Sequence, residues 1–257
     1  MNDAQVQVCH LNKQFDGKVI LKDVNLKVMP GESHIVIGLS GSGKSVLLKC
    51  ILGLLQADSG QVLVEGEDWS CLSKSEQLKR MRSIGMVFQG AALFDSLPVW
   101  ENVSFVLRQQ GMQKKEARER AEEVLEKVGL PHICDKMPVE LSGGMAKRVG
   151  LARAICHRPK VIFYDEPLSG LDPVMSDVIT SLMRQLHEEM QVTSLTIAHN
   201  MKLVRDFGDH VSMLYQGSIH LQTPASELDL QDDPIFRQFI EGRANGPMDI
   251  NHHQGST

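Results

Sequence analysis

The sequence has no long uninterrupted run of apolar residues. Its most apolar stretch, VLLKCILGLL, is interrupted by Lys49 and falls well short of the roughly 18 apolar residues that a membrane-spanning helix needs. The N-terminus, MNDAQVQVCH, lacks the basic region and the apolar segment of a signal peptide. We therefore expect neither a spanning helix nor a leader, so any membrane role has to come through a partner.

The sequence also lacks a basic stripe and paired cysteines. Its formal net charge of −5 at pH 7 argues against nucleic acid as a partner. The five cysteines are an odd number without a C-x-x-C pair, so neither a disulfide scaffold nor a zinc site is indicated. A reducing cytosol fits this use of cysteine best. His252 and His253, near the end of the chain, fit a disordered end better than a metal site.

Hydrophobic periodicity indicates an α/β protein. Residues 5–37 alternate short β-rich runs with turn signals, which favours strands. The stretch KKEARERAEEVLEKVGL predicts an amphipathic helix that ends at Gly129. Its apolar positions are Ala117, Ala121, Val124, Leu125 and Val128. Further on, KVIFYDEP and VTSLTIAHN have the length of buried strands and flank a helical segment, so we expect a right-handed parallel crossover.

The stretch GLSGSGKS matches the phosphate-binding pattern G-x-x-x-x-G-K-[ST], and it lies between an apolar strand and a helix. Backbone amides would cradle nucleotide phosphates, Lys44 would neutralise the β and γ oxygens, and the Ser45 hydroxyl would bind Mg²⁺. A plain glycine-rich turn is the alternative, and it does not account for the complete motif in this context. The residues expected to bind the nucleotide here are Gly38, Ser40, Gly41, Ser42, Gly43, Lys44, Ser45 and Val46.

Polar residues follow three apolar runs of strand length. In VIFYDE, Asp165 can hold the hydration shell of a metal and Glu166 can polarise the attacking water. His199 in TIAHN could contact the γ-phosphate, and Gln89 in VFQG could sense the metal or the water. Because the carboxyl ends of parallel strands meet at one crevice, these positions fit a single site. Taken alone, each has a plainer interpretation: an acidic turn, a surface or packing histidine, and an uninterpretable glutamine.

The stretch LSGGMAKRVGLARAI puts a serine and two glycines ahead of a segment with helical periodicity. Paired glycines carry no side chain, so a helix that opens this way brings backbone N–H groups close to an anion. The helix dipole supplies about 0.3–2 kcal/mol, less than the roughly 4–7 kcal/mol of an arginine supplied in trans. We therefore expect the Ser142 hydroxyl and the Gly143 and Gly144 amides to contribute as well. This would be a second anion site in one chain.

In their order along the chain, these motifs resemble those of ABC-type ATPase subunits. The resemblance covers about residues 5–222. It rests on the phosphate loop, Gln89, the signature LSGGM (Leu141 to Met145), the VIFYDE strand, SGLD (Ser169 to Asp172) and His199. Met145 stands where the family more often has Gln, which leaves the two glycines of the signature untouched.

The resemblance implies a P-loop NTPase fold of the α/β class, with a RecA-like core, an N-terminal antiparallel β subdomain and an inserted α-helical subdomain. The core with its β subdomain would comprise residues 1–88 and 160–225. The helical subdomain that carries the signature would comprise residues 89–159, and a C-terminal extension residues 226–257.

The resemblance also implies an ATPase that uses ATP and Mg²⁺ and works as a head-to-tail dimer of this chain. The signature of one copy would close over the ATP held by the phosphate loop of the other, with Asp172 lining the shared surface. Phe15 lies where the family places an aromatic residue that stacks on adenine, although a lone Phe more often packs in a core. The catalytic residues would be Glu166, His199, Gln89 and Lys44. The metal ligands would be Ser45, Gln89 and Asp165.

Two stretches, QGAALFDSLPVWENV and the signature region, are similar to those of the ATPases of Mla-type phospholipid transport systems. The tail DDPIFRQFIEGRANGPM resembles the extension by which those ATPases reach a partner subunit. The resemblance implies a peripheral place on the cytoplasmic face of the bacterial inner membrane, held by a multi-spanning permease. It also implies an MCE-domain lipid-binding protein and a small STAS-domain protein as partners, in phospholipid transport between membranes that maintains outer-membrane lipid asymmetry.

Two apolar segments are candidates for contacts with partners. The side chains beside Gln89 that we expect to be exposed to a permease are Leu93, Phe94, Leu97 and Trp100, and packing in the core is the alternative. The apolar face of the tail is formed by Ile235, Phe236, Phe239 and Ile240. A helix this short is marginal alone, so it needs a surface on its own domain or on a neighbour.

Two other functions share the catalytic motifs. One is the ATPase of an importer for a small polar solute, which only the signature methionine and the tail distinguish from the phospholipid system. The other is a non-transport ATPase of the cell-division type. A chromosome-type ATPase would need a long coiled-coil insertion, and the sequence has no sustained heptad run.

Overall fold

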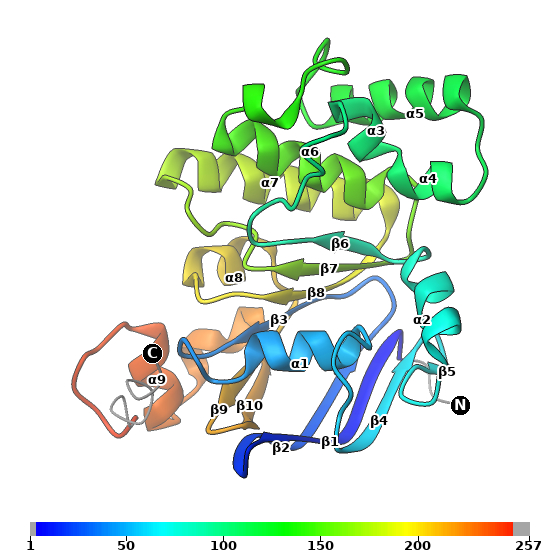
Figure 1. Ribbon diagram of the computed structural model, residues 1–257. Coiled ribbons are helices and arrows are strands. Elements are labelled where there is room, and N and C mark those ends of the chain that lie inside the picture. Colours follow the sequence, from blue (N-terminus) through cyan, green and yellow to red (C-terminus); the bar gives the residue numbers. More distant parts are fainter. Residues whose placement is uncertain (1–3, 249–257) are drawn as a thin grey trace. The chain divides into compact units, whose positions relative to one another are not determined.

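The computed structural model describes residues 4–248, so His252 and His253 lie outside the described residues (Figure 1). The chain divides into two compact units. The first unit comprises Met1–Ser73 and Leu195–Thr257, and the second comprises Lys74–Ser194. Within residues 4–248, no helix combines the length and the apolar character needed to cross a membrane.

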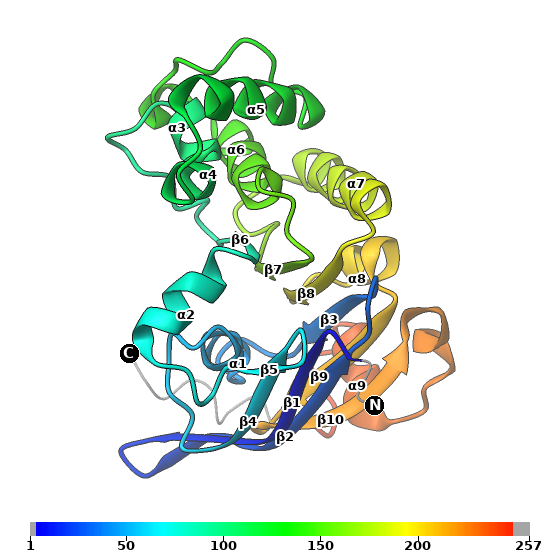
Figure 2. The same ribbon diagram turned by 90° about the vertical axis from the view of Figure 1, so that its right-hand side faces the viewer.

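The first unit contains a four-stranded antiparallel sheet in the order β2-β1-β4-β5 (Figure 2). Its strands are β1 (Val6–Phe15), β2 (Lys18–Val28), β4 (Ser59–Val64) and β5 (Glu67–Asp68). Val6 lies opposite Val28 on one side and Val64 on the other, and all three side chains are buried. Three buried valines in register give this sheet an apolar face, which fixes the pairing of its strands. The predicted antiparallel β subdomain is confirmed.

A second group of strands in the first unit surrounds β3 (Ser33–Ile37). β3 pairs in parallel with β9 (His210–Tyr215), and β9 pairs antiparallel with β10 (Ser218–Pro224). The buried His34 ring of β3 links this strand to β9, because its Nε2 lies 2.7 Å from Ser212 Oγ. Its Nδ1 lies 2.7 Å from Glu32 Oε1, just before β3. Burial alone would raise the pKa of the Glu32 carboxyl, but hydrogen bonds from His34 and the Met29 N–H and the nearby histidine charges outweigh it, so this pKa is lowered. A satisfied polar network therefore holds the parallel pair together.

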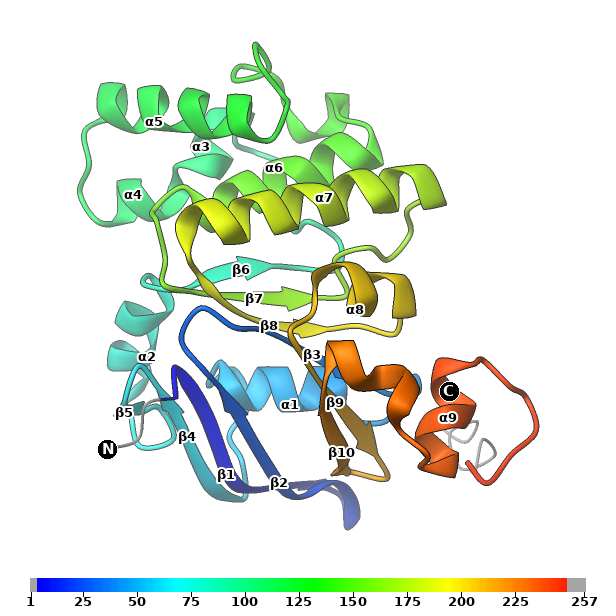
Figure 3. The ribbon, with the colours of Figure 1, turned by 180° about the vertical axis from the view of Figure 1, so that it is seen from behind.

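The first unit ends in a short helical tail (Figure 3). The helices of the first unit outside the tail are α1 (Lys44–Ile51) and α8 (Met201–Phe207). The tail consists of the 3₁₀ segment η2 (Ala225–Leu230) and α9 (Pro234–Ile240). Phe236 of α9 is fully buried, whereas Phe239 is half-buried. Beyond α9 the chain turns back, because the Met248 N–H donates to Gln238 Oε1 at 2.7 Å. The predicted apolar face is thus anchored mainly through one aromatic ring within its own unit.

The second unit carries the parallel pair of β6 (Gly85–Val87) and β7 (Val161–Asp165), together with most of the helices (Figure 1). The helices are α2 (Lys74–Met81), α3 (Val99–Val103), α4 (Phe105–Gln109), α5 (Lys114–Lys127), the 3₁₀ segment η1 (Pro138–Glu140), α6 (Gly143–Ile155) and α7 (Pro173–Met190). Strand β8 (Thr193–Ile197) crosses the division between the units and is buried along its whole length.

Helix α5 has the amphipathic pattern that the sequence predicts. Its apolar positions Ala117, Ala121, Val124 and Leu125 are fully buried, and the chain leaves the helix through Gly129 at φ +67°. A positive φ is readily adopted by glycine, which explains why the helix ends there. One expectation about exposure is wrong, because Trp100 is only 4% exposed. Its ring packs in the core of this unit, with the Lys114 ammonium 5.3 Å from its centroid.

The architecture confirms the predicted fold class. Antiparallel strands lie in the first unit, parallel pairs occur in both units, and a group of helices occupies the second. The predicted domain boundaries at residues 88, 159 and 225 remain a prediction.

Replacing Phe236 by Ala tests how the tail is anchored. Removing a fully buried phenyl ring costs about 3–5 kcal/mol, so the free energy of unfolding should fall by about that amount. The matched variant Phe239→Ala removes a half-buried ring and should cost clearly less. Urea denaturation followed by circular dichroism measures both. Equal losses in the two variants would mean that Phe236 is not the anchor.

Candidate functional site

The phosphate loop joins β3 to α1 in the first unit, as the sequence predicts. Helix α1 begins at Lys44, directly after Gly43 at φ +104°, and no side chain caps it. The first N–H groups of a helix lack intrahelical acceptors, and the dipole adds partial positive charge there. The loop therefore offers main-chain donors to an anion.

Close packing explains two glycines of this loop. A Cβ at Gly38 would lie 2.4 Å from the Leu214 carbonyl oxygen, and a Cβ at Gly43 would lie 3.1 Å from the Ile20 carbonyl oxygen. Main-chain atoms cannot move aside as the end of a side chain can. Glycine is required at Gly38 for space as well as for conformation, so β9 sets the path of the loop.

Lys44 is buried and lies against its own loop. Its ammonium donates hydrogen bonds to the carbonyl oxygens of Gly38 at 2.8 Å and of Leu39 at 2.9 Å. These bonds hold a positive charge inside the loop where phosphate oxygens would bind. The Ser45 side chain, one position further along α1, is exposed.

The other expected residues of the first unit are Phe15 and His199. Phe15 is 43% exposed and does not pack in the core, and the Lys13 ammonium lies 5.1 Å from its ring centroid. His199 is exposed between β8 and α8. The preceding Ala198 N–H donates to the Val36 carbonyl of β3 at 3.1 Å, so this segment runs beside the strand that leads into the phosphate loop.

In the second unit, Asp165 ends β7 and Glu166 follows it in a turn. One carboxylate oxygen of Asp165 is buried. Glu166 adopts φ +47°, a left-handed conformation that costs a residue other than glycine about 1 kcal/mol or more. Its carbonyl accepts a hydrogen bond from the Ser169 N–H at 3.1 Å, which closes the turn.

Gln89 lies on a segment that α6 holds through two buried cations. The Gln89 side chain donates to Ser169 Oγ at 3.1 Å, which joins it to the SGLD motif. Its main-chain carbonyl accepts a hydrogen bond from the Lys147 ammonium. The Arg153 guanidinium donates to the carbonyls of Ala91 and Ala92, both at 2.6 Å.

Sequence reasoning missed Lys147 and Arg153. Both are 8% exposed, and burial lowers the pKa of each, although the charge of Glu166 partly opposes this for Lys147. Lysine and arginine are almost never fully buried unless they are paired, so their place in a helical stretch predicts solvent exposure. The nearest signal was their spacing, since Lys147, Gly150 and Arg153 recur every three residues along one side of the helix.

The signature opens α6 as the sequence predicts. Ser142 is the N-cap, and its Oγ accepts a hydrogen bond from the Met145 N–H at 3.3 Å. The hydroxyl hydrogen of Ser142 is not used by this cap, and Gly143 and Gly144 occupy the first helical positions. The end of α6 therefore combines a hydroxyl donor with main-chain amides.

Asp172 has a structural role within the second unit, whereas the two glycines of the signature are less constrained by their neighbours. A Cβ at Gly143 would meet nothing within 4 Å, but a Cβ at Gly144 would lie 2.6 Å from Met175 Cε. The Asp172 carboxylate caps α7 by accepting the Met175 N–H at 2.9 Å. Because Met175 Cε is the end of a flexible side chain, this contact alone does not require glycine at Gly144, and no atom of residues 4–248 lies near enough to require it at Gly143.

The side chains expected to meet a permease differ in exposure. Phe94 is 42% exposed, and Leu93 and Leu97 are half-buried. The buried Asn102 amide holds this segment, because it accepts the Phe94 N–H at 2.7 Å and donates to the Leu97 carbonyl at 2.8 Å. An exposed aromatic ring is thus held on a braced loop.

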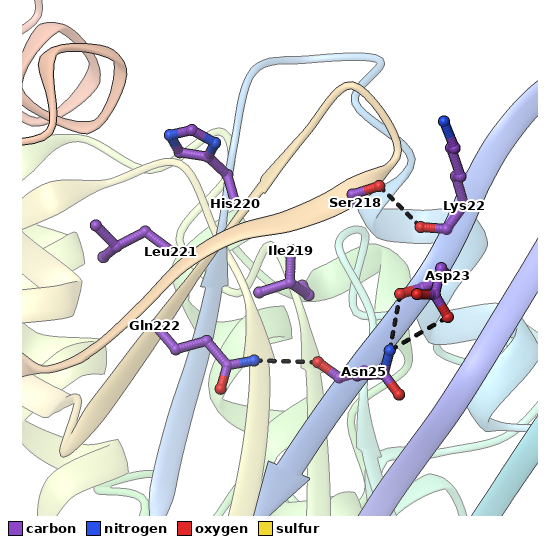
Figure 4. A pocket seen from close by; sticks show the side chains of 8 residues that line it. All are labelled: Lys22, Asp23, Asn25, Ser218, Ile219, His220, Leu221 and Gln222. Carbon is purple, nitrogen blue, oxygen red and sulfur yellow. Dashed lines mark hydrogen bonds between the residues drawn. The ribbon is translucent and has the colours of Figure 1, made fainter.

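A polar groove of the first unit lies between β2 and β10 (Figure 4). Two hydrogen bonds cross it, from Ser218 Oγ to the Lys22 carbonyl at 2.8 Å and from Gln222 Nε2 to the Asn25 carbonyl at 3.1 Å. None of the predicted site residues lines it.

Comparison with known proteins identifies the family of the chain. The family model described as ABC transporter matches residues 21–169. The chain is 37% identical over 250 residues to the probable ribonucleotide transport ATP-binding protein Mkl of Mycobacterium leprae, across 97% of this chain and 72% of that protein. It belongs to the ABC transporter family. The resemblance inferred from the ordered motifs is confirmed, and this ABC protein is the ATPase subunit of a transporter, coupling ATP hydrolysis to transport.

Other relatives of this ABC ATPase carry different names. It is 38% identical over 264 residues to the chloroplastic protein trigalactosyldiacylglycerol 3 of Arabidopsis thaliana, across 96% of this chain and 76% of that protein. It is 35% identical over 235 residues to the methionine import ATP-binding protein MetN of Legionella pneumophila, across 91% of this chain and 69% of that protein. A solved dimeric ATP-binding cassette, bound to ADP and Pi after hydrolysis, matches with a TM-score of 0.79 and 31% identity, across 86% of this chain and 98% of the other.

The close approach at Gly38 predicts the effect of a single methyl group. Overpacking against a main-chain carbonyl costs about 1–3 kcal/mol, and because that cost falls on the binding loop, Gly38→Ala should weaken ATP binding by about fivefold to about 150-fold. Gly66→Ala is the control, since Gly66 has φ +79° but a Cβ there would meet nothing within 4 Å. Titration of each purified variant with a fluorescent ATP analogue measures the dissociation constant. Unchanged affinity in Gly38→Ala would show that the loop can move away from Leu214.

Proposed function

We propose that this ABC ATPase drives phospholipid transport between bacterial membranes and so maintains outer-membrane lipid asymmetry. The observation that carries this proposal is its similarity, over almost the whole chain, to a plant protein named after a galactolipid. The signature methionine and the tail, which resemble those of Mla-type ATPases, support the same cargo. Transport between membranes fits an ATPase that acts through partner subunits.

Each expected site residue has a proposed role in hydrolysis. Lys44 would exchange its two loop carbonyls for phosphate oxygens, because a charge-assisted bond to an anion is stronger than one to a neutral carbonyl. Glu166 would accept a proton from the attacking water, and His199 would orient that water against the γ-phosphate. Phe15 would stack on adenine with the ring face that Lys13 does not cover.

The proposed metal ligands suit Mg²⁺ by their chemistry. The exposed Ser45 hydroxyl, the Gln89 amide oxygen and the Asp165 carboxylate are hard oxygen ligands of the kind that Mg²⁺ prefers. When bound, the ion would neutralise negative charge that develops on the phosphates. Gln89 would have to release Ser169 or turn its amide oxygen toward the ion.

We further propose that the active unit is a dimer in which each ATP lies between two copies. The Ser142 hydroxyl and the first amides of α6 are hydrogen-bond donors at a helix N-terminus. In the proposed dimer they would meet the phosphates of the ATP that Lys44 of the other copy holds. Within residues 4–248, a Cβ at Gly143 would meet nothing within 4 Å, which leaves room there for a ligand held by a second copy. Exposed valines flank these motifs, with Val139 91%, Val174 73% and Val178 42% exposed. Val174 and Val178 are four residues apart on α7, so their exposed side chains share one face of the helix that an interface would cover.

The proposed partners follow from the same resemblance. A multi-spanning permease would hold the ATPase on the cytoplasmic face of the inner membrane, with exposed Phe94 at the contact. An MCE-domain lipid-binding protein and a small STAS-domain protein would complete the system. The C-terminal extension, residues 226–257, would contribute contacts through the part of α9 that Phe236 does not bury.

Import of a small polar solute is the second candidate. It is favoured by the similarity to a methionine import protein and by the ribonucleotide transport named for the mycobacterial relative. These systems share the catalytic motifs, so the two candidates differ in cargo and partner rather than in the chemistry of the site. The cell-division alternative has no comparable support among these relatives.

Mixing two inactive variants tests the shared site. Ser142→Arg removes the signature, and Lys44→Ala removes the phosphate loop, so each should hydrolyse ATP at a small fraction of the normal rate. In a head-to-tail dimer, a mixed pair regains one intact site, and an equal mixture should recover about a quarter of the wild-type rate. Phosphate release from the mixture measures this.

A second measurement covers the case in which a dimer hydrolyses ATP only when both of its sites are intact, because the mixture would then stay inactive. The Glu166→Gln variant should bind ATP without hydrolysing it and should dimerise when ATP is added, as judged by light scattering after size-exclusion chromatography. If the mixture stays inactive and this variant stays monomeric with ATP and its membrane partner, each chain builds its site alone.

The cargo is tested by purifying the ATPase with its membrane partner. We expect a multi-spanning permease to co-purify with bound phospholipid, and Glu166→Gln to abolish ATP-dependent transfer of a fluorescent phospholipid between the purified system and vesicles. ATP hydrolysis stimulated by methionine or a ribonucleotide, with no bound phospholipid, would support the importer instead.

A further inference from the structure

Helix α6 contacts residues 89–92, here called the Gln89 segment, through one residue on each of three consecutive turns. The Lys147 ammonium reaches the Gln89 carbonyl, and the Arg153 guanidinium reaches the carbonyls of Ala91 and Ala92. Between them, the Cα of Ala91 lies 3.5 Å from the Cβ position of Gly150, which is ordinary van der Waals contact. A methyl group would therefore fit at Gly150, whereas a longer side chain would enter the space that the segment occupies.

The Gln89 segment has a main-chain conformation that needs such support. Ala91 and Ala92 are consecutive residues at φ +60° and +48°, where an L-residue with a Cβ is strained. Strained residues persist where their surroundings over-determine them. The hydrogen bonds from Arg153 act on these same two residues, and the bond from Lys147 acts on Gln89 itself.

We infer that Lys147 is a positioning residue that ties the Gln89 segment to the helix that opens with the signature. Lys147 lies about one turn beyond Ser142, so a shift of the signature carries the Gln89 main chain with it. The side chain of Gln89 would then reach the metal or the water only when α6 holds its carbonyl. This inference rests on the proposed role of Gln89 in hydrolysis.

The surroundings of Lys147 support a role in positioning over one in stability alone. Its charge interacts with that of Glu166, which follows β7, and its hydrogen bond goes to Gln89, which follows β6. One buried cation is thereby linked both to the residue proposed to accept a proton from the attacking water and to a proposed ligand of the metal. Arg153, about two turns along, supports the same segment at Ala91 and Ala92 instead of at Gln89.

Lys147→Met removes the donor and keeps an apolar stem of nearly the same length. We expect kcat to fall by about tenfold, the size of one charge-assisted hydrogen bond, with KM for ATP changed less than twofold. Lys147→Arg keeps a donor and should recover most of the lost kcat. Thermal unfolding of each variant checks that the fold is retained, and Lys147→Gln provides a second series if the methionine variant does not fold.

A double-mutant cycle with Gln89→Ala separates positioning from stability. If Lys147 acts through Gln89, then Gln89→Ala should lower kcat strongly in the wild type and little in the Lys147→Met background. Arg148→Met is the matched control, because Arg148 is the next residue of α6 and donates to the Gly129 carbonyl at 3.1 Å instead of to the Gln89 segment. Its loss and that of Gln89→Ala should simply multiply.

Each result of this cycle is decisive. Losses that multiply within about a factor of two for Lys147→Met and Gln89→Ala would overturn the positioning role. Recovery by Lys147→Arg with strong coupling to Gln89 would support it. Normal turnover of Gln89→Ala alone would instead remove the proposed role of Gln89, which is a distinct failure.

Discussion

Charge that is buried on a helix has to be met by polar groups, and on α6 those groups are main-chain carbonyls. Transfer of an unpaired cation out of water costs several kcal/mol, so Lys147 and Arg153 can be buried only where oxygens are presented to them. The Gln89 segment presents three. The same requirement that stabilises α6 therefore fixes the course of a loop that carries a residue of the proposed site, and stability and position have one cause.

The phosphate loop is governed by space in addition to charge. Gly38 can lie against the Leu214 carbonyl only because it has no Cβ, and the Lys44 ammonium occupies the loop before any anion does. Main-chain donors set in this way need no rearrangement to receive phosphate, which is the preorganisation that favours binding of charged groups. Both units thus present helix N-termini, one after Gly43 and one after Ser142, each shaped by glycine.

Local patterns predicted the elements well, while contacts between distant residues were out of their reach. The phosphate loop and the capped start of α6 follow from glycines within a few positions of each other, and α5 follows from its own periodicity. The burial of Trp100 was one of two possibilities, because an apolar segment fits packing in the core as well as exposure to a permease. Lys147 and Arg153 escaped, since their carbonyl partners lie about sixty positions away along the chain. The pattern of a single sequence likewise does not show which residues of the proposed site lie close together, so it does not show which of them act together.

The left-handed backbone of Glu166 sets folding and chemistry against each other at one position. Asparagine tolerates this conformation better than glutamate does, so a protein selected for stability alone would have little reason to keep a carboxylate there. With the role proposed for Glu166, some conformational ease is given up so that an acidic group stands just past the end of a strand.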